Sequence, residues 1–406
     1  MSNIPKLRFP EFKGEWEEKR IQDFAECCAG ATPDTKKDEY WIDGTIPWMS
    51  SGEVNNTFIY STEKKITQLG YDKTSTKLLP SNTVVIALAG QGKTRGTVAI
   101  TRIELCTNQS LCAVLPDINL NSEYLFYFLS SQYKQLRNSS TGGDDSRGGL
   151  NLKIIGNFRL PYTTLAEQQK IADFLSNVDS IITAETKILN TLQKKKKALM
   201  QKLFTQQLRF KSDDGKDFPE WEEKKLGEIS SSPKYGLNAS GIDYDGEHKY
   251  LRITDIDEVT HTFSPEEITT PSEFSDDYLL EENDIVFART GASTGKTYLY
   301  NPNDGDLYFA GFLIKFHIKD ANARFVFYQT CTHEYEKWVH IMSTRSGQPG
   351  INSEEYSTLK IQLPCIEEQQ KIADCLSSLD SLIQNQQKVV TTWQQRKKAL
   401  LQQMFV

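Results

Sequence analysis

Two glycine-rich segments hold the residues whose chemistry is easiest to recognise. Residues 291–297 read GASTGKT and residues 89–96 read AGQGKTRG, and both place lysine after glycine, as phosphate-binding loops do. The spacing does not fit that role, because three residues instead of four separate Gly291 from Gly295. For the other segment, Ala87, two residues before it, stands where the first glycine is required. Both segments continue into predicted strands, so no helix N-terminus is available to hold a phosphate. Nucleotide binding is therefore not expected here.

The same segments are better suited to contact with a nucleic acid. Glycine and threonine at a hairpin tip let a backbone approach a duplex closely, while lysine and arginine reach phosphates or guanine edges. Two further loops, at 139–151 and 343–352, each combine one arginine with the amides and hydroxyls that read bases. The predicted DNA-contacting residues are Lys93, Thr94, Arg95, Arg147, Asn151, Arg289, Thr290, Lys296, Arg345, Gln348 and Asn352. A solvated hairpin and ordinary turn chemistry are the alternative interpretations.

The elements that position these loops are duplicated along the chain. Residues 167–173 read EQQKIAD, and residues 368–374 read EQQKIAD again. The openings of the two halves also match, with WEEKRI at 16–21 and WEEKKL at 221–226. A solenoid repeat runs to roughly 20–50 residues, which is much shorter than this period. The chain is therefore interpreted as two copies of a whole domain.

Each EQQKIAD motif opens a stretch that predicts one long helix. Eight of the ten a and d positions over five heptads are apolar in each stretch, which indicates a coiled coil. The polar exceptions are Glu185 and Lys196 in the first stretch, and Gln386 and Lys397 at the equivalent places in the second. We expect the two helices to pack antiparallel, with Glu185 near Lys397 and Lys196 near Gln386. A capping box formed by Thr164 with Glu167, the first residue of the motif, is expected to begin the first helix.

The remainder of each half predicts a β-rich domain with short β-branched or aromatic runs between turn residues. We expect strands at 83–89, 96–101, 110–116, 284–290, 296–301 and 312–318, and one amphipathic helix per half, at 122–136 and 321–338. The expected fold class is α+β, with two β-rich domains related by pseudo-two-fold symmetry and joined by two long antiparallel coiled-coil helices. The expected boundaries, in the order domain, helix, domain, helix, are 1–163, 164–206, 207–364 and 365–406.

The charge of the chain is unevenly distributed. The 406 residues carry a net charge of −7, of which residues 207–364 contribute −12, whereas residues 1–164 contribute +1. A nucleic-acid-binding domain is usually basic, so the acidity of the second half argues against DNA binding there. A local basic groove is nevertheless sufficient for a duplex. The acidic residues are expected on a face turned away from DNA or on a surface for another protein.

Composition argues against several other classes of protein. The mean hydropathy is −0.51, and no apolar run approaches the roughly 18 residues of a membrane helix. The opening sequence MSNIPKLRFPEF lacks the apolar core of a signal peptide. Seven cysteines without CxxC spacing favour a reducing compartment, so a cytoplasmic protein is expected. None of the five histidines pairs with a cysteine at ligand spacing, so no metal site is expected.

The chain closely resembles the specificity subunit of Type I restriction-modification enzymes over essentially its whole length. The resemblance rests on LPYTTLAEQQKIADFLSNVDSII at 160–182 and LPCIEEQQKIADCLSSLDSLI at 363–383. It also rests on the helix ends KKKKALMQKLF and RKKALLQQMF and on the two WEEK openings. An LP segment followed by EQQKIA and a long coiled-coil helix is highly specific to that family.

The resemblance implies two target recognition domains, each reading one half of a split double-stranded DNA sequence, with the long helices as a spacer. It implies no catalysis and no cofactor in this chain. The partners implied are two modification subunits, which bind S-adenosylmethionine and methylate adenine, and usually two restriction subunits, which use ATP and Mg. A specificity subunit of a methylation-only complex, or a decoy without a restriction partner, is the alternative.

Overall fold

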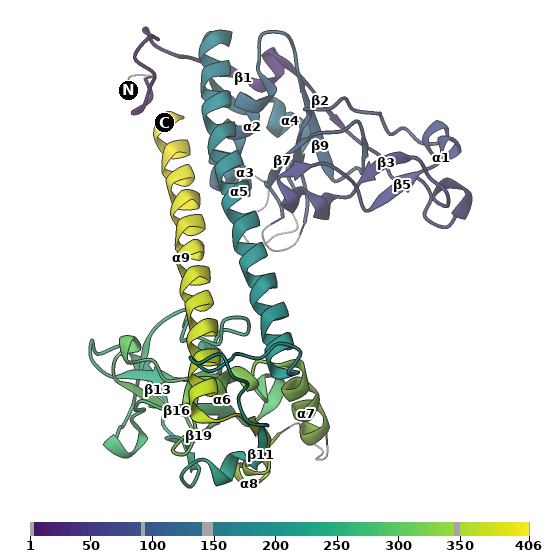
Figure 1. Cartoon of the computed structure of the whole chain (residues 1–406). Coiled ribbons are helices and arrows are strands. Elements are labelled where there is room, and N and C mark those ends of the chain that lie inside the picture. The colour runs from purple at the N-terminus through teal and green to yellow at the C-terminus, as the bar shows by residue number, and fades with distance from the viewer. Residues whose placement is uncertain (1–3, 91–93, 140–148, 345–349, 406) are drawn as a thin grey trace. The chain divides into compact units, whose positions relative to one another are not determined.

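The computed structural model of the chain describes residues 4–90, 94–139, 149–344 and 350–405. Its contacts divide the chain into two compact units. The first unit comprises Met1–Lys187 with Gln387–Val406, and the second comprises Ile188–Gln386. Each unit contains one β-rich domain and parts of two long helices, α5 (Leu165–Phe204) and α9 (Ile366–Met404) (Figure 1). Within the described residues, no helix has the length and apolar character needed to cross a membrane.

The domain of the first unit is built on a five-stranded sheet of order β2-β9-β6-β7-β4, beside a three-stranded sheet of order β5-β3-β8 and the β1–β10 pair. Its strands are β1 (Glu17–Arg20), β2 (Ala25–Ala29), β3 (Ile46–Met49), β4 (Phe58–Ile59), β5 (Lys64–Ile66), β6 (Val84–Ala87), β7 (Val98–Thr101), β8 (Cys106–Thr107), β9 (Leu111–Pro116) and β10 (Arg159–Tyr162). Its short helices are α1 (Gln68–Asp72), α2 (Ser122–Ser131), α3 (Tyr133–Asn138) and α4 (Leu152–Gly156).

The domain of the second unit has a four-stranded sheet of order β12-β19-β16-β17 and the pairs β11–β20, β13–β15 and β14–β18. Its strands are β11 (Glu222–Lys225), β12 (Lys234–Tyr235), β13 (Gly241–Asp243), β14 (Lys249–Leu251), β15 (Thr269–Pro271), β16 (Asp284–Ala288), β17 (Thr297–Leu299), β18 (Leu307–Phe309), β19 (Leu313–His317) and β20 (Lys360–Leu363). Its helices are α6 (Ala323–Gln329), α7 (His333–Ser343) and α8 (Ser353–Ser357).

The central strand of each sheet is apolar on both faces because it lies between two cores. On β6, Val84 and Ile86 belong to one buried cluster, while Val85 and Ala87 belong to another on the opposite face. This arrangement explains why the VVIA run does not alternate with polar residues. Strand β16 is divided between two clusters in the same way. The six strands predicted from sequence are confirmed within a few residues at their ends.

The two predicted short helices are each interrupted, which corrects the expectation of one helix per half. The stretch 122–136 forms α2 and α3, with Gln132 between them at φ −95° and ψ 16°. The stretch 321–338 forms α6 and part of α7, and Thr332 between them is extended at φ −97° and ψ 157°. Its hydroxyl accepts a hydrogen bond from the Tyr335 amide and so begins a new helix. Amphipathic spacing alone does not reveal such a cap.

The glutamate of the EQQKIAD motif is anchored at the start of each long helix. Glu167 is 1% exposed, and Arg8 donates to both of its carboxylate oxygens at 2.7 and 2.9 Å. The Trp16 indole donates to the same carboxylate at 3.1 Å. The second unit repeats these contacts on its own motif, with Arg209, Trp221 and Glu368. The motif therefore fastens the long helix to the N-terminal segment of its own domain.

The predicted capping box at Thr164 is only half formed. The Thr164 hydroxyl accepts a hydrogen bond from the Glu167 amide at 3.3 Å. The Glu167 carboxylate does not return the bond expected of a capping box, because Arg8, Trp16 and the Thr163 hydroxyl donate to it. The first glutamine of each motif copy also binds its domain. Gln168 Oε1 accepts from the Asn121 amide at 2.9 Å, and Gln369 does the same with Asn322.

The two long helices pack antiparallel in each unit, as expected, but the partners of their two seam lysines differ from those predicted. In the first unit Lys397 contacts Asp179 Oδ1 at 2.6 Å, and in the second Lys196 contacts Asp380 Oδ1 at 2.5 Å. The expected partners were Glu185 and Gln386, respectively. That prediction was wrong because it considered only seam positions, whereas each aspartate directly follows a seam residue.

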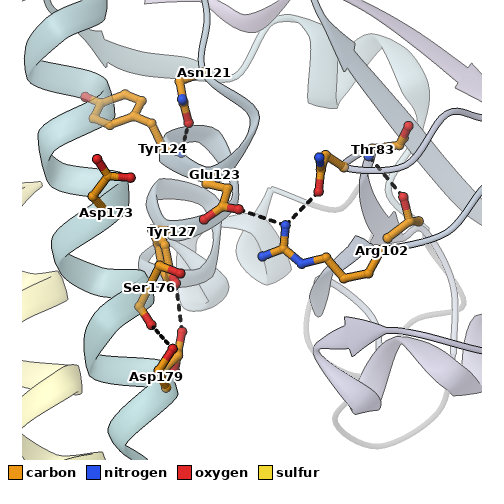
Figure 2. Close-up of polar contacts among 12 residues, drawn as sticks. Thr83, Arg102, Asn121, Glu123, Tyr124, Tyr127, Asp173, Ser176 and Asp179 are labelled. Atoms are coloured by element: carbon orange, nitrogen blue, oxygen red, sulfur yellow. Dashed lines mark hydrogen bonds and ion pairs between the residues drawn. The ribbon is translucent and has the colours of Figure 1, made fainter.

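A tyrosine from the domain completes each of these pairs. The Tyr127 hydroxyl on α2 donates to Asp179 Oδ2 at 2.9 Å, a contact visible between α2 and α5 in Figure 2. Tyr328 on α6 donates to Asp380 Oδ2 at 2.7 Å in the second unit. Burial, followed by the neighbouring carboxylate, raises the pKa of both tyrosines far above the ordinary value. Each tyrosine therefore remains a neutral hydrogen-bond donor that ties its domain to the helix pair.

Candidate nucleic-acid interface

The first predicted contact segment lies between β6 and β7, which pair as an antiparallel hairpin. The last hydrogen bonds before the tip join Ala87 to Thr97 and Gly96. Thr94 is half-buried and Arg95 is only 7% exposed, so most of the Arg95 side chain is covered by the domain. Lys93 lies outside the described residues. The hairpin prediction is confirmed, and the contact role of these residues stays a prediction.

The second predicted contact segment is the hairpin tip between β16 and β17. Its last hydrogen bonds join Ala288 to Lys296 and Gly295, so this tip is two residues shorter than the first. Gly295 has φ +91°, and a Cβ at this position would lie 2.5 Å from Val339 Cγ1. Glycine is therefore required for both conformation and space. The strand that follows the tip also accounts for the failure of GASTGKT as a phosphate loop, because β17 begins at Thr297, where a phosphate loop is followed by a helix.

The second pair of predicted loops lies beside these tips. The Leu150 amide donates to the Leu88 carbonyl at 2.9 Å, and the Ile351 amide donates to the Arg289 carbonyl at 2.9 Å. The structure thus brings the described C-terminal end of each loop to the same end of the sheet as the hairpin of its own unit. Three of the predicted loop residues lie outside the described residues, namely Arg147, Arg345 and Gln348.

The two predicted asparagines have a structural role. The Asn151 side chain accepts from the Ile154 amide and caps α4, and Asn352 accepts from the Glu355 amide and caps α8, each at 2.9 Å. The turn chemistry considered as an alternative is therefore present at both positions. One side-chain oxygen is used in each cap, and any contact with DNA has to involve the remaining amide group.

The two predicted cations of the second tip are in different electrostatic states. Lys296 Nζ lies 2.9 Å from Glu258 Oε1, so its charge is compensated. The Arg289 guanidinium carbon lies 4.9 Å from the centre of the Tyr235 ring, in a cation–π contact. Thr290 forms a β-bridge with Gly350, the first described residue after the gap at 345–349.

Tyr235 was not selected from the sequence, although it joins three segments of this site. It belongs to β12, its ring faces Arg289, and its hydroxyl accepts from the Ser353 amide at 3.2 Å. Burial raises the pKa of Tyr235, but the Ser353 hydrogen bond and the Arg289 charge lower it more, so the pKa lies below the ordinary value. A two-residue strand carries no periodic signal, which explains why sequence reasoning missed it.

A separate cluster of possible metal ligands lies in the second unit. One ligand atom from each of Glu281, Asp284 and His317 falls within 4.8 Å of the others. Asp284 is fully buried and is already bound by Lys315 at 3.1 Å and by His317 at 2.9 Å. The positive charge of Lys315 beside this carboxylate disfavours a metal cation, so the group is interpreted as an ionic network around the buried Asp284.

Comparison with known proteins identifies the family. The family model for the Type I restriction modification DNA specificity domain matches residues 13–194 and again residues 219–392. The two matches cover most of the chain and coincide with its two halves. The chain therefore belongs to the Type I restriction modification DNA specificity domain family.

Curated relatives from Methanocaldococcus jannaschii carry the same description. The chain is 30% identical over 226 residues to the Type I restriction enzyme MjaIX specificity subunit, which covers 53% of this chain and 51% of the relative. It is 28% identical over 414 residues to the MjaVIII specificity subunit, which covers 97% of this chain and 92% of the relative. The chain thus spans about half of the first relative and nearly all of the second.

Solved structures share the fold. The S subunit of a Type I restriction-modification system from M. genitalium superposes with a TM-score of 0.61 at 17% identity, and 99% of each chain is covered. A structure from work on complex assembly and conformational transition of the type I R-M system gives 0.56 at 16% identity and covers 95% and 96% of the two chains. The expected fold, with two β-rich domains and two long antiparallel helices, is confirmed.

Proposed function

We propose that this chain is the DNA-recognition subunit of a Type I restriction-modification complex and binds a bipartite site, one half-site per domain. The observation that supports this proposal most is that both units repeat the same arrangement of a hairpin and a loop. In each unit the described ends of a hairpin tip and of a capped loop lie at the same end of the central sheet. The loops vary between the units, whereas the helix anchors repeat contact by contact.

The proposal divides the chain by task. Residues 1–163 and 207–364 form the two target recognition domains, and residues 164–206 and 365–406 form the helices that space them. The predicted DNA-contacting residues lie on or beside the hairpin tips and the capped loops. The helices offer the more similar surfaces of the two copies and are proposed to carry two modification subunits and two restriction subunits.

Catalysis belongs to the partners in this account. The modification subunits bring S-adenosylmethionine and methylate adenine, and the restriction subunits bring ATP and Mg. This chain contributes recognition and assembly in the cytoplasm, and no cofactor of its own is assigned. The acidity of residues 207–364 suggests that much of the affinity for DNA comes from the assembled complex, since a phosphate backbone is repelled by uncompensated carboxylates.

Native mass spectrometry of the chain co-expressed with its modification subunit, followed by footprinting on its DNA, tests the proposal. The expected complex contains two modification subunits per chain, and the expected footprint has two protected segments separated by a spacer. A complex with a single modification subunit, or one continuous protected segment that survives deletion of either domain, would contradict it.

A further inference from the structure

One end of the central sheet in the second unit carries a cluster whose equivalent described positions in the first unit hold other residue types. The Arg289 amide donates to the Phe312 carbonyl at 3.0 Å, and the Leu88 amide donates to the Ser110 carbonyl at 2.9 Å. Leu88 is therefore the backbone counterpart of Arg289. Figure 1 shows the sheets that contain these positions, with β16 and β19 in one unit and β9 in the other.

Strand pairing identifies the counterpart of Tyr235. Tyr235 on β12 is opposite Ile314 of β19, and Ala29 on β2 is opposite Cys112 of β9. Ile314 and Cys112 are each the second residue of their strand. Both strands pair with the central strand of their own sheet in the same register. Arginine, tyrosine and phenylalanine thus replace leucine, alanine and serine at three equivalent backbone positions. The two sheets share this backbone arrangement but carry different side chains at this end.

The side chains of the cluster remain accessible. Tyr235 is 38% exposed and Phe312 is 57% exposed, although both are aromatic. Arg289 is half-buried and stacks on the Tyr235 ring at 4.9 Å. The hydrogen bond from the Ser353 amide to the Tyr235 hydroxyl holds the ring against the first residue of α8. Tyr235 therefore has little freedom to move away from the guanidinium.

The charge of Arg289 is not compensated by a carboxylate within the part of the chain that the structure describes. Its Nε is covered and has no hydrogen-bond partner among those residues. A ligand therefore reaches the guanidinium through its two terminal nitrogens. Their end-on geometry matches two neighbouring acceptors, such as O6 and N7 on the major-groove edge of guanine.

We propose that Tyr235 is a positioning residue that orients Arg289 toward a guanine in the half-site bound by the second domain. This inference rests on the proposed function. Phosphates are the other possible partner of an arginine, but a contact needed on any duplex would be expected in both copies of the domain. Leu88 occupies the equivalent place in the first unit and is 8% exposed. A position that differs in this way fits sequence discrimination better than backbone binding.

Duplex binding by the assembled methyltransferase tests the role of Tyr235. The duplexes carry the motif methylated by the wild-type complex, with each base pair of the second half-site replaced in turn. Tyr235→Leu removes the ring, Tyr235→Phe keeps it, and Tyr244→Leu removes a tyrosine of similar exposure elsewhere in the same unit. We expect Tyr235→Leu to lose about tenfold in affinity for the motif and to lose discrimination at one G·C pair. Tyr235→Phe should retain most of both, and Tyr244→Leu should behave as wild type.

Each remaining outcome is decisive. If Tyr235→Leu weakens binding equally to every duplex, Arg289 contacts a phosphate and the inference is wrong. If Tyr235→Leu and Tyr244→Leu are both indistinguishable from wild type on a sequence-selective complex, the inference fails while the proposed function stands. A wild-type complex without sequence preference overturns the proposed function itself.

Discussion

Lys397 of α9 contacts Asp179 of α5 through a 2.6 Å ion pair, and the same carboxylate accepts a hydrogen bond from the domain. The side chains are 18% and 11% exposed, so the pair is mostly shielded from water. In the second unit the helices exchange roles, because the lysine comes from α5 and the aspartate from α9. Each domain is therefore held by a helix pair to which both halves of the chain contribute.

Loss of the lysine in this pair should destabilise the first unit. Lys397→Met leaves the Asp179 carboxylate without its cation, and we expect a loss of about 2 kcal/mol in the free energy of unfolding, between the values for exposed and buried pairs. Urea unfolding of the full chain measures the loss. Lys398→Met, at the neighbouring exposed position, is the matched control. Equal effects of the two changes, within about 0.5 kcal/mol, would show that the pair has no structural role.

The anchored glutamate predicts a dependence of stability on pH. Burial raises the pKa of Glu167, but hydrogen bonds from Arg8 and Thr163 and the Arg8 charge lower it more, so the net pKa lies below the ordinary value of a glutamate. The folded state therefore favours the ionised form. The resulting stabilisation is complete above the unfolded pKa and is lost as pH falls through the lower folded value.

Glu167→Gln removes this titration, so the variant should lose less stability than wild type as the pH is lowered from about 6 to about 3. At neutral pH the variant itself should be the less stable protein, since Arg8 loses its anion. Urea unfolding over this range measures both effects. Glu15→Gln, at an exposed position, is the control. If the stability of Glu167→Gln depends on pH with the same slope as wild type, Glu167 is not an ionised anchor.

The end of α9 should be essential to the first domain. Phe405 is 6% exposed, and its ring lies 5.4 Å from Tyr124 and 5.8 Å from Phe128. Phe405→Ala leaves a cavity in that core and should cost about 3 kcal/mol of unfolding free energy. Ile118→Ala, at a residue that is 87% exposed, should change stability by less than about 0.5 kcal/mol. Thermal unfolding of both variants measures these changes. A Phe405→Ala variant as stable as wild type would be inconsistent with the packing described.

Arg289 should discriminate bases through the planar shape of its guanidinium group as well as through its charge. Arg289→Lys keeps the charge but loses the two-nitrogen fork, so methylation of DNA carrying the intact second half-site should fall by about tenfold. Arg324→Lys makes the same change at an exposed arginine and should leave the rate near wild type. Methylation rates on matched duplexes measure both variants. A rate for Arg289→Lys equal to that of wild type would remove this residue from the interface.

Much of the fold was predictable because its signals are periodic. The apolar runs around Val84–Ala87 and Asp284–Ala288 predicted central strands, and the heptads predicted both long helices. The partner of Lys397 was not predictable, because Asp179 lies off the heptad seam and its burial depends on Tyr127 from a distant segment. The equivalence of Leu88 and Arg289 was missed for a related reason. This equivalence follows from the backbone pairing of the strands, and the different lengths of the two hairpin tips hide it in the sequence.

Reading of one half-site by each domain is the central claim about this chain. Single-molecule sequencing of methylated adenines, in DNA from cells expressing this chain with its modification subunit, measures that directly. The account predicts one split motif, in which Arg289→Ala alters only the half read by the second domain. A continuous motif, or a loss of specificity in both halves from that single change, would contradict it.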